Sequence, residues 1–439
     1  MEAEQVLQLR SELSAYLAGF GSCMGRASNA RHLKTYVEGQ MGPLQRKSVE
    51  PIALAAGTPV RTLQEFLSMF RWDHERLRDL HQRRVVRRHH HDAAIGIFDE
   101  TSFPKKGRKT ACVQRQHCGA LGKVENCVVS VHLVYATPTF CTLLDGEPYL
   151  PEQTWHEDRD RCREAGVPDE VVYRSKCHMA LEQLQRALGN GVRFGWLTFD
   201  EGYGAKPWFL HALDGLGQRY VAEMPRSFRI WTAEPRVRAR SHPCDAQRAG
   251  ENSEGAGGAP LMVQSNPMIT VASALAHSPK VRGLEWKKYV VNDSTTGPLV
   301  WEAVRLPVWL QDERGLPTRA HHLVIARNVL TGETKFFLSN APEKTQMEDM
   351  LFVGFSRWRI ERLFEDGKGE LGMDHFEART YAAIQRHLIV SCVSHAFLAE
   401  HVERWRPKSG GADGVPGPRR RKRTRPAVGQ RPALLAGAC

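Results

Sequence analysis

Two short apolar segments, each followed at once by an aspartate, constrain the fold of this chain most strongly. Residues 94–98 read Ala-Ile-Gly-Ile-Phe before Asp99, and residues 195–199 read Gly-Trp-Leu-Thr-Phe before Asp200. A short apolar run that stops at a polar residue is typical of a buried β-strand. Because segments such as Val172–Leu188 have helical character, these strands belong to an α/β fold. The sequence therefore predicts two strands whose ends present carboxylates, at the place where α/β sheets gather functional groups.

The later part of the chain adds further strands and two long helices. We expect strands at Asn126–Tyr135, Lys288–Val291, Val300–Leu306, His322–Arg327 and Lys335–Leu338. The turn at Thr331-Gly332 predicts a hairpin between the last two. Residues 235–260 are rich in Gly, Ala, Ser and charge, which indicates a flexible excursion. Helical patterns follow at Glu348–Glu370 and Ala382–Trp405.

Residues 1–92 read as helical. Within them, residues 48–69 have the order helix, glycine turn, helix, with Thr58 as an N-cap and Pro59 at the first helical position. The second helix has apolar residues at amphipathic spacing: Leu63, Phe66, Leu67 and Phe70. Two interpretations remain open for this segment, a helix-turn-helix that reads DNA and an ordinary helical hairpin.

The positive charge of the chain is concentrated at its C-terminus. Lys and Arg number 61 against 49 Asp and Glu, a net charge of +12. Residues 406–439 hold nine basic residues and one acid, a net +8, which leaves +4 for the first 405 residues. Such a tail indicates a polyanionic partner such as nucleic acid, and the alternative is a tail that only aids solubility.

Several classes of protein are excluded by composition. No apolar run approaches the ~20 residues of a membrane span, and the first residues lack the apolar core of a signal peptide. The ten cysteines contain no Cys-x-x-Cys pair, so a zinc enzyme or zinc ribbon is not expected. Scattered thiols in a long chain are typical of a reducing compartment, and we expect a cytoplasmic protein without membrane contact.

A third acid stands in a distinctive helical segment. Arg357 and Glu361 are four residues apart, and Lys368 follows Glu361 by seven, so all three share one helix face. A carboxylate between two cations suits a site that holds a metal ion and phosphate. Taken alone, the same spacing also describes a surface salt-bridge ladder. Together with Asp99 and Asp200, however, Glu361 completes the set of three acids that would hold divalent metal such as Mg²⁺.

These residues resemble the C-terminal signature of bacterial insertion-sequence transposases of the DDE superfamily. That signature is Tyr, two residues, Arg, three residues, Glu, six residues, Lys, and Arg357, Glu361 and Lys368 match its last three positions. Gly354 stands where the family has Tyr, and a neighbouring aromatic residue is the alternative there, Phe355 or Phe352. Further segments are similar to a DDE_5-type branch of the family: 99–107, 115–131, 149–161 and 367–380. The resemblance runs from about residue 15 to 400.

The resemblance implies roles for individual residues. Asp99, Asp200 and Glu361 would be the catalytic acids and the metal ligands. Their lesser alternatives would be Glu100, Glu201 and Glu365, in that order. Four cations would bind DNA phosphates: Arg357, Lys368, Lys105 and Lys106.

The resemblance also implies an architecture, a ribonuclease H-like α/β core interrupted by a β-rich insertion and preceded by helices. The expected parts are a DNA-end-binding helical domain (1–92), the first part of the core (93–228), the insertion with its excursion (229–345), the last part of the core (346–406) and a disordered basic tail (407–439). Trp286 and Trp301 in the insertion could stack on a flipped base, although a buried core position is the competing interpretation.

The implied reaction is cleavage of phosphodiesters at transposon ends and strand transfer into target DNA. Two Mg²⁺ ions would be the cofactors, and Mn²⁺ would substitute for them. The partners would be double-stranded DNA and a second copy of the chain in a synaptic homodimer, in the bacterial cytoplasm with the nucleoid. The alternatives are an inactive DNA-binding protein derived from a transposase and a metal-dependent nuclease without strand transfer.

Overall fold

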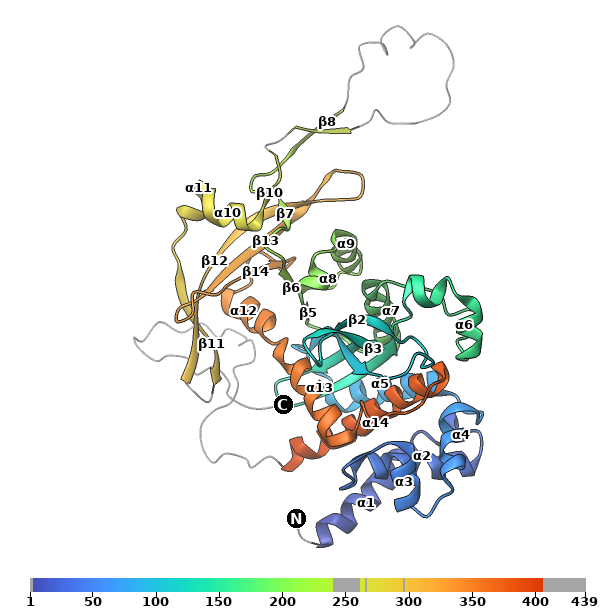
Figure 1. The fold of residues 1–439 in the computed structure, drawn as a ribbon. Coiled ribbons are helices and arrows are strands. Elements are labelled where there is room, and N and C mark those ends of the chain that lie inside the picture. The colour runs from blue at the N-terminus through green and yellow to red at the C-terminus, as the bar shows by residue number, and fades with distance from the viewer. Residues whose placement is uncertain (1–2, 240–260, 265–266, 295–296, 406–439) are drawn as a thin grey trace, which may run out of the picture. The chain divides into compact units, whose positions relative to one another are not determined.

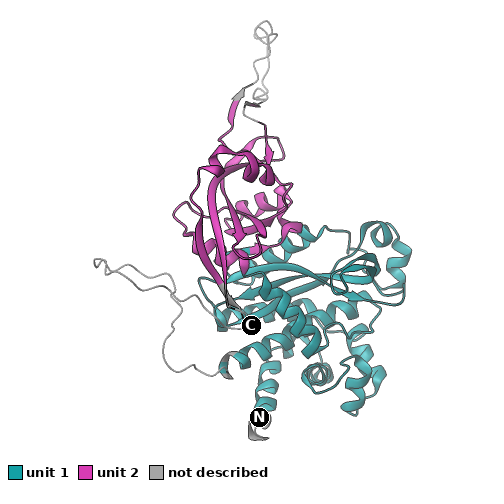
Figure 2. Cartoon of the chain, turned by 60° about the vertical axis from the view of Figure 1, so that its left-hand side comes forward, with its two compact units in different colours: residues 1–197, 356–433, 437–439 teal, residues 198–355, 434–436 magenta. Residues whose placement is uncertain are grey.

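The computed structural model describes residues 3–239, 261–264, 267–294 and 297–405. The chain folds into two compact units, each treated by itself below (Figures 1 and 2). The first unit contains residues 3–197 and 356–405, and the second contains the described residues between 198 and 355. The predicted tail at 407–439 and most of the predicted excursion, residues 240–260, lie outside the described residues.

The first unit collects helices from both ends of the chain. They are α1 (Ala3–Ala18), η1 (Gly21–Cys23), α2 (Ala27–Met41), α3 (Val49–Ala55), α4 (Val60–Ser68), α5 (His74–His89), η2 (Glu152–His156), α6 (Arg159–Glu164), α7 (Lys176–Gly189), α13 (Trp358–Leu371) and α14 (Tyr381–Trp405). The prediction that residues 1–92 contain helices is confirmed. The helices of residues 3–89 pack with α14 in one hydrophobic cluster, which includes Leu33 of α2, Phe66 of α4 and Val393 of α14. The helical region therefore shares its core with the C-terminal helix.

One strand of the first unit carries Asp99, the first predicted acid. The strands are β1 (Ile95–Pro104), β2 (Gln114–Cys118), β3 (Lys123–Ala136) and β4 (Cys141–Pro148), and the chain leaves the unit within β5 (Trp196–Phe199). Strand β3 lies between β1 and β2 and also pairs with β4, all antiparallel. Strand β5 approaches the start of β1, because the amides of Gly195 and Trp196 both donate to the carbonyl of Ala94. The α/β class predicted from the sequence is confirmed.

Strand β1 does not stop at Asp99, so that part of the prediction is wrong. The strand continues to Pro104, and Asp99 lies opposite His132 in the middle of the β1–β3 ladder. The physical reason lies in the next residues: Thr101 and Phe103 favour strands and are buried, so pairing with β3 continues past the acid. Asp99 is therefore fixed by hydrogen-bonded backbone on both sides.

The second unit is rich in strands. Its elements are α8 (Glu201–Gly204), α9 (Pro207–Gly215), β6 (Tyr220–Met224), β7 (Arg229–Ile230), β8 (Arg236–Ala239), β9 (Leu261–Gln264), β10 (Ile269–Thr270), α10 (Val271–His277), α11 (Pro279–Arg282), β11 (Lys287–Ser294), β12 (Gly297–Gln311), β13 (Pro317–Asn328), β14 (Thr334–Ser339) and α12 (Met347–Phe355). Strands β11, β12, β13, β14 and β6 pair in that order, all antiparallel. The predicted hairpin is confirmed as β13–β14, and Gly332 in its turn has a φ of +73°.

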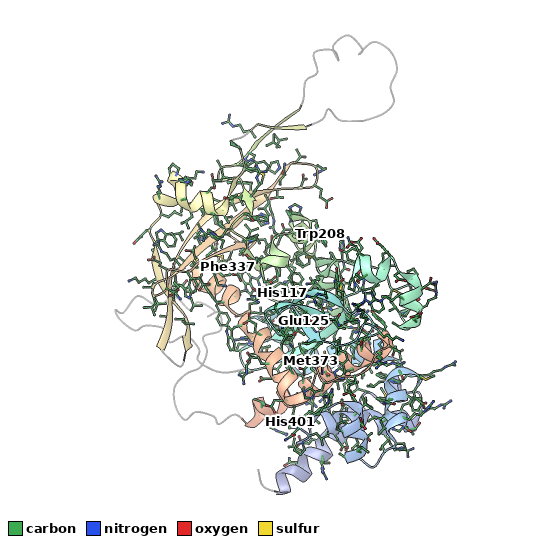
Figure 3. The ribbon with its side chains drawn as sticks, in the orientation of Figure 1. His117, Glu125, Trp208, Phe337, Met373 and His401 are labelled. Atoms are coloured by element: carbon green, nitrogen blue, oxygen red, sulfur yellow. The ribbon has the colours of Figure 1, made fainter. Side chains whose placement is uncertain are left out.

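The predicted helix Glu348–Glu370 is interrupted. Helix α12 ends at Phe355, and α13 begins at Trp358. Gly354 lies close to the ring of Phe337 on β14 (labelled in Figure 3), since a Cβ at this glycine would be 3.1 Å from that ring and 3.2 Å from Val221. A larger residue at position 354 would therefore need the side chains of Phe337 and Val221 to move by a few tenths of an ångström. Phe355 packs on Trp301, with ring centroids 4.6 Å apart, and Trp301 is buried, which agrees with the core interpretation of this tryptophan.

Two further features concern the thiols and the helices. The eight cysteines in the described part of the chain are all buried, and no disulfide joins them: Cys23, Cys112, Cys118, Cys127, Cys141, Cys162, Cys177 and Cys392. Among the helices that the structure describes, none is both long and apolar enough to cross a lipid bilayer.

Candidate active site

A shared guanidinium joins two of the predicted acids in the first unit. The Nη1 of Arg357 is 2.9 Å from Oδ2 of Asp99, and its Nη2 is 2.9 Å from Oε1 of Glu361. The Asp99 side chain is 13% exposed and that of Arg357 is 23% exposed, whereas Glu361 is 54% exposed. The cluster thus has one nearly buried carboxylate and one that reaches solvent.

Local structure explains why these side chains meet. Asp99 is held in β1 and its Oδ1 accepts a hydrogen bond from the amide of Glu100 at 2.8 Å. Helix α13 buries Ile360, Leu363 and Phe364, so the opposite face carries Glu361 towards solvent. Arg357 directly precedes α13 and lies one turn before Glu361, as the predicted i, i+4 spacing requires.

Glu100, the alternative first acid, faces the other way. Successive side chains of a strand point to opposite faces of its sheet. Glu100 accordingly binds Lys176 at the start of α7, with Nζ and Oε1 2.5 Å apart. The structure therefore separates the two neighbouring acids, Asp99 with α13 and Glu100 with α7.

Glu365, the alternative third acid, has different partners from Glu361. Its side chain is 73% exposed and lies 3.7 Å from Arg362, which also binds Asp366 at 3.1 Å. This group is a surface ion-pair ladder of the kind that the sequence left open for the whole segment. Arg362, Glu365 and Asp366 therefore form a surface ion-pair ladder. Glu361 instead binds Arg357, which also binds Asp99.

Asp200 lies in the second unit, directly after β5 as predicted. Its Oδ1 accepts hydrogen bonds from the amides of Gly202 at 2.9 Å and Tyr203 at 3.3 Å, so the carboxylate caps α8. The next residue, Glu201, is exposed. The close approach of α8 to β6 requires Gly204, where a Cβ would be 2.1 Å from the carbonyl of Glu223. The position of Asp200 is therefore set by a strand end and a helix start.

The predicted phosphate-binding cations differ in their surroundings. Burial lowers the pKa of Lys105 to about 8, and its Nζ donates to the carbonyl of Phe376 at 2.7 Å and lies over that ring. Burial also lowers the pKa of Lys368, whose ammonium is 5.7 Å from the ring of Phe103. Lys106 is exposed. Of the three lysines, Lys106 is open to solvent, while Lys105 and Lys368 are held against aromatic rings.

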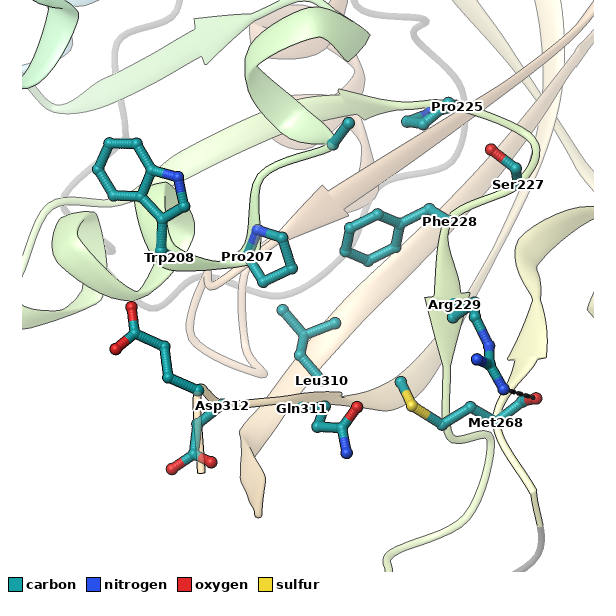
Figure 4. Close-up of a pocket in the computed structure, with 12 residues that line it drawn as sticks. Pro207, Trp208, Pro225, Ser227, Phe228, Arg229, Met268, Leu310, Gln311 and Asp312 are labelled. Atoms are coloured by element: carbon teal, nitrogen blue, oxygen red, sulfur yellow. Dashed lines mark hydrogen bonds between the residues drawn. The ribbon is translucent and has the colours of Figure 1, made fainter. Parts of the chain in front are cut away.

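An open pocket of about 550 Å³ lies in the second unit (Figure 4). Trp208, Phe228 and Leu310 form part of its wall, and Arg229 donates to the carbonyl of Met268 at 3.4 Å. Asp312 and Glu313 also line it. Because its two acids outnumber its one arginine, this pocket lacks the positive character of a phosphate site.

Comparison with known proteins places the chain in a family. The family model described as "DDE superfamily endonuclease" matches residues 19–291, which is more than half of the chain. This chain belongs to the DDE superfamily of endonucleases. The matched region includes Asp99 and Asp200 and ends before Glu361.

A curated relative carries a more specific name. The chain is 33% identical over 187 residues to a protein of Microchaete diplosiphon described as "Probable transposase for insertion sequence element IS701". The aligned part covers 42% of this chain and 46% of that relative, so the chain spans about half of the relative's length.

The acids of this DDE superfamily member fit a divalent metal ion by their donor chemistry. Carboxylate oxygens are the ligands that hard cations such as Mg²⁺ prefer, and Asp99 and Glu361 already share one cation, the Arg357 guanidinium. Across the part of the chain that the structure describes, no group of three or more His, Cys, Asp or Glu is arranged to hold a metal ion.

Sequence reasoning missed a buried ion pair behind the site. The Nε of Arg78 on α5 is 3.3 Å from Oδ1 of Asp145 on β4, and both side chains are almost fully buried. Gln82 adds a hydrogen bond to Oδ2 at 3.2 Å. The pair joins α5 to the strand that pairs with β3, and β3 in turn holds Asp99 in register. The sequence does show one sign of this pair, since Asp145 is an acid within the apolar segment 141–150. Its partner Arg78 lies 67 residues earlier, and no local pattern in the sequence links the two.

Proposed function

We propose that this chain is a DNA transposase that cleaves phosphodiesters at the ends of an insertion sequence and joins those ends to target DNA. Its membership of the DDE superfamily endonucleases and its similarity to a protein described as an insertion-sequence transposase support this function. One observation carries the proposal furthest. Asp99 and Arg357 are 258 residues apart in the sequence, yet they meet at 2.9 Å, beside Glu361.

The proposed catalytic acids are Asp99, Asp200 and Glu361, in a core of ribonuclease H-like fold. They would hold two Mg²⁺ ions, with Mn²⁺ as a substitute, and the ions would supply an activated oxygen nucleophile and charge neutralisation when bound. The strand position of Asp99 and the helix-capping position of Asp200 support their roles, because each carboxylate is oriented by backbone.

The chain's own residues would do the remaining work by positioning. Arg357 and Lys368 would hold a DNA phosphate through charge-assisted hydrogen bonds, and the exposed Lys106 would bind backbone phosphate nearby. For Lys105, its hydrogen bond to the carbonyl of Phe376 supports a role in fixing the loop after β1 rather than direct DNA contact. Phosphoryl transfer of this kind depends mainly on position and electrostatics, so no covalent enzyme intermediate is needed.

A synaptic complex that brings two DNA ends together implies a homodimer, and the proposed setting is the bacterial cytoplasm with the nucleoid. A metal-dependent nuclease without strand transfer and an inactive DNA-binding derivative are the alternatives. The three acids favour an active enzyme, and the products of the reaction distinguish the three cases.

The test uses the purified full chain with duplexes that carry the DNA flanking its gene, in Mg²⁺ buffer. We expect nicked ends, followed by joined products when a target plasmid is added. Glu361→Gln should reduce cleavage by more than about 10³-fold, because it removes a metal ligand, whereas Glu365→Gln should leave it nearly unchanged. Cleavage without joining would support a nuclease instead, and full activity of Glu361→Gln would overturn the assignment of the third acid.

A further inference from the structure

Strand β3 carries a fully buried histidine directly opposite Asp99. In the ladder between β1 and β3, Asp99 pairs with His132, and Thr101 pairs with Ser130. Side chains directly opposite each other in an antiparallel pair lie on the same face of the sheet. The imidazole of His132 therefore lies on the face that also carries the carboxylate of Asp99, and none of it is exposed to solvent.

Two hydrogen bonds fix this imidazole in one tautomer. Its Nδ1 lies 3.1 Å from the carbonyl oxygen of Asp145 on β4, and a carbonyl can only accept, so Nδ1 carries the proton. Its Nε2 then accepts a hydrogen bond from the hydroxyl of Ser130, at 2.6 Å. Burial lowers the pKa of His132 to about 3, so the ring is neutral at pH 7. Because both nitrogens are engaged, the ring cannot turn without losing a hydrogen bond.

Gly146 of β4 makes room for the imidazole. This glycine is the partner of His132 in the ladder between β3 and β4. A Cβ at position 146 would lie 2.4 Å from Cε1 and 2.5 Å from Nδ1 of the ring, so any side chain there would displace the ring. The backbone of β4 therefore limits how far the imidazole can move.

Helix α13 packs on the same imidazole. The ring of Phe364 meets it edge to face, with centroids 5.2 Å apart and an interplanar angle of 69°. Phe364 follows Glu361 by three residues and Arg357 by seven, so it lies within two helical turns of both. The imidazole is thus a spacer of fixed orientation between the sheet that holds Asp99 and the helix that carries Glu361.

We propose that His132 is a positioning residue that sets the place of Arg357 and Glu361 relative to Asp99. The inference rests on the proposed transposase function, for which it names a residue that acts through the acid cluster. Groups that act together at a site must be held to within about 0.5 Å by side chains whose own orientations are locked. His132 meets this requirement, since it is bound to β3 and β4 by hydrogen bonds and contacts α13 through Phe364.

The first experiment measures the coupling between Asp99 and Arg357 in the full chain. A double-mutant cycle with Asp99→Asn and Arg357→Gln gives this coupling from urea unfolding, and the cycle is repeated in a chain that carries His132→Ala. We expect the coupling to fall to less than about half of its original value, because α13 loses its support beside Asp99. Unchanged coupling would overturn the inference.

The control variant removes another buried imidazole. His81 on α5 is also fully buried, and one of its ring nitrogens lies 2.8 Å from the carbonyl of Leu143 on β4. His81→Ala should destabilise the protein but leave the coupling between Asp99 and Arg357 unchanged. An equal fall in the two variants would show a general loss of packing and would also overturn the inference.

A milder variant covers the case in which His132→Ala does not fold. Phe364→Leu keeps an apolar side chain on α13 but removes the ring that contacts the imidazole. It should reduce the coupling between Asp99 and Arg357 in the same direction. A folded Phe364→Leu protein with full coupling would contradict the role of His132 as a spacer.

Kinetics provide a second readout, with DNA duplexes that carry the flanking sequence. His132→Ala should lower kcat by about 10- to 100-fold, because catalysis is sensitive to small displacements of the acids. The KM for DNA should change little, since a fully buried ring does not contact the duplex. A raised KM with unchanged kcat would indicate a role in DNA binding and would overturn the inference.

Failure of this inference can be told apart from failure of the proposed function, because the coupling is measured without DNA or metal. If His132→Ala reduces the coupling but the wild type never cleaves DNA, the transposase proposal is contradicted and the positioning role stands. If the wild type cleaves its flanking DNA and His132→Ala retains full coupling, the role of His132 alone is contradicted.

Discussion

Arg357 occupies the place between two carboxylates that the proposed chemistry assigns to metal ions. Its guanidinium is 2.9 Å from an oxygen of Asp99 and 2.9 Å from an oxygen of Glu361. The single positive charge of the arginine partly neutralises the two acids, and a divalent ion that binds both must take over that role. Arg357 is thus expected both to stabilise the acids and to compete with the metal.

Replacement of Arg357 should therefore increase metal affinity. We expect Arg357→Gln to bind Mn²⁺ roughly tenfold more tightly, which corresponds to the loss of about 1.4 kcal/mol of competing ion-pair energy. Titration of free Mn²⁺ by electron paramagnetic resonance measures this without any need for activity. Arg362→Gln is the control, because Arg362 binds other acids of the same helix. Weaker Mn²⁺ binding by Arg357→Gln would contradict the competition.

The sequence allowed part of this cluster to be predicted. The contact between Arg357 and Glu361 follows from helix geometry at a spacing of four. The meeting of Arg357 with Asp99 does not, because no local periodicity encodes a contact across 258 residues. The family resemblance implied only that Asp99 and Glu361 act at one site and that Arg357 binds phosphate there. The separation of Asp99 from Glu100 became definite once β1 was seen to continue through both residues.

At the level of elements, the junction of α5 with α14 is an ion-pair cluster. Glu400 on α14 binds Arg84 at 3.0 Å and lies 3.7 Å from Arg88 and 3.8 Å from His89. Burial alone would raise the pKa of Glu400, but the neighbouring His89 and the hydrogen-bonded Arg84 outweigh it and lower the pKa to about 2. The ionised carboxylate is therefore strongly favoured in the folded protein.

This cluster should make stability depend on pH. The pKa of Glu400 is lower in the folded than in the unfolded chain, so its stabilisation is full above about pH 4.5 and is lost as the pH falls towards 2. We expect Glu400→Gln to have a free energy of unfolding about 1–3 kcal/mol lower than that of the wild type at pH 7. Between pH 4.5 and 3, its free energy of unfolding should fall by less than that of the wild type. Urea unfolding at both pH values measures the difference. The surface variant Glu365→Gln should behave like the wild type, and an equally steep pH dependence in Glu400→Gln would contradict the assignment.

The glycine at position 354 gives a second prediction at this scale. A Cβ there would press on Phe337 and Val221, whereas a Cβ at Gly369 of α13 would meet no atom within 4 Å. We expect Gly354→Ala to lower the free energy of unfolding by about 1 kcal/mol or more, and with it the midpoint of thermal unfolding. Gly369→Ala should preserve or raise that midpoint. Calorimetry distinguishes the two. A stabilised Gly354→Ala protein would show that the contact with β14 can relax.

The ends of elements were harder to predict than their existence. The hairpin β13–β14 was predicted because its turn contains Gly332, which adopts a positive φ. The end of β1 was predicted wrongly, because pairing with β3 continues past Asp99, and the break between α12 and α13 was not predicted. Such tertiary contacts leave no periodic signal in the segment itself.

For the whole molecule, the uneven charge leads to a prediction about DNA affinity. Residues 407–439 contain eight Lys and Arg and one Asp. Their deletion should weaken binding to unrelated duplex DNA. It should also make the binding less dependent on salt: the slope of the logarithm of the binding constant against the logarithm of the salt concentration should become shallower by about 0.9 for each lost phosphate contact. Fluorescence anisotropy at several salt concentrations measures both effects. A variant with a Gly/Ser segment of equal length is the control, and unchanged binding in both would mean that the tail does not contact DNA.

We propose that Asp99, Asp200 and Glu361 act together on DNA, and excision of the native element tests this most directly. A donor plasmid would carry the gene with its flanking DNA, expressing the wild type, Asp99→Ala or Glu100→Ala. We expect excised ends and new insertions from the wild type and from Glu100→Ala, whose side chain points to α7, and neither product from Asp99→Ala. Excision by Asp99→Ala at the wild-type level would contradict the account.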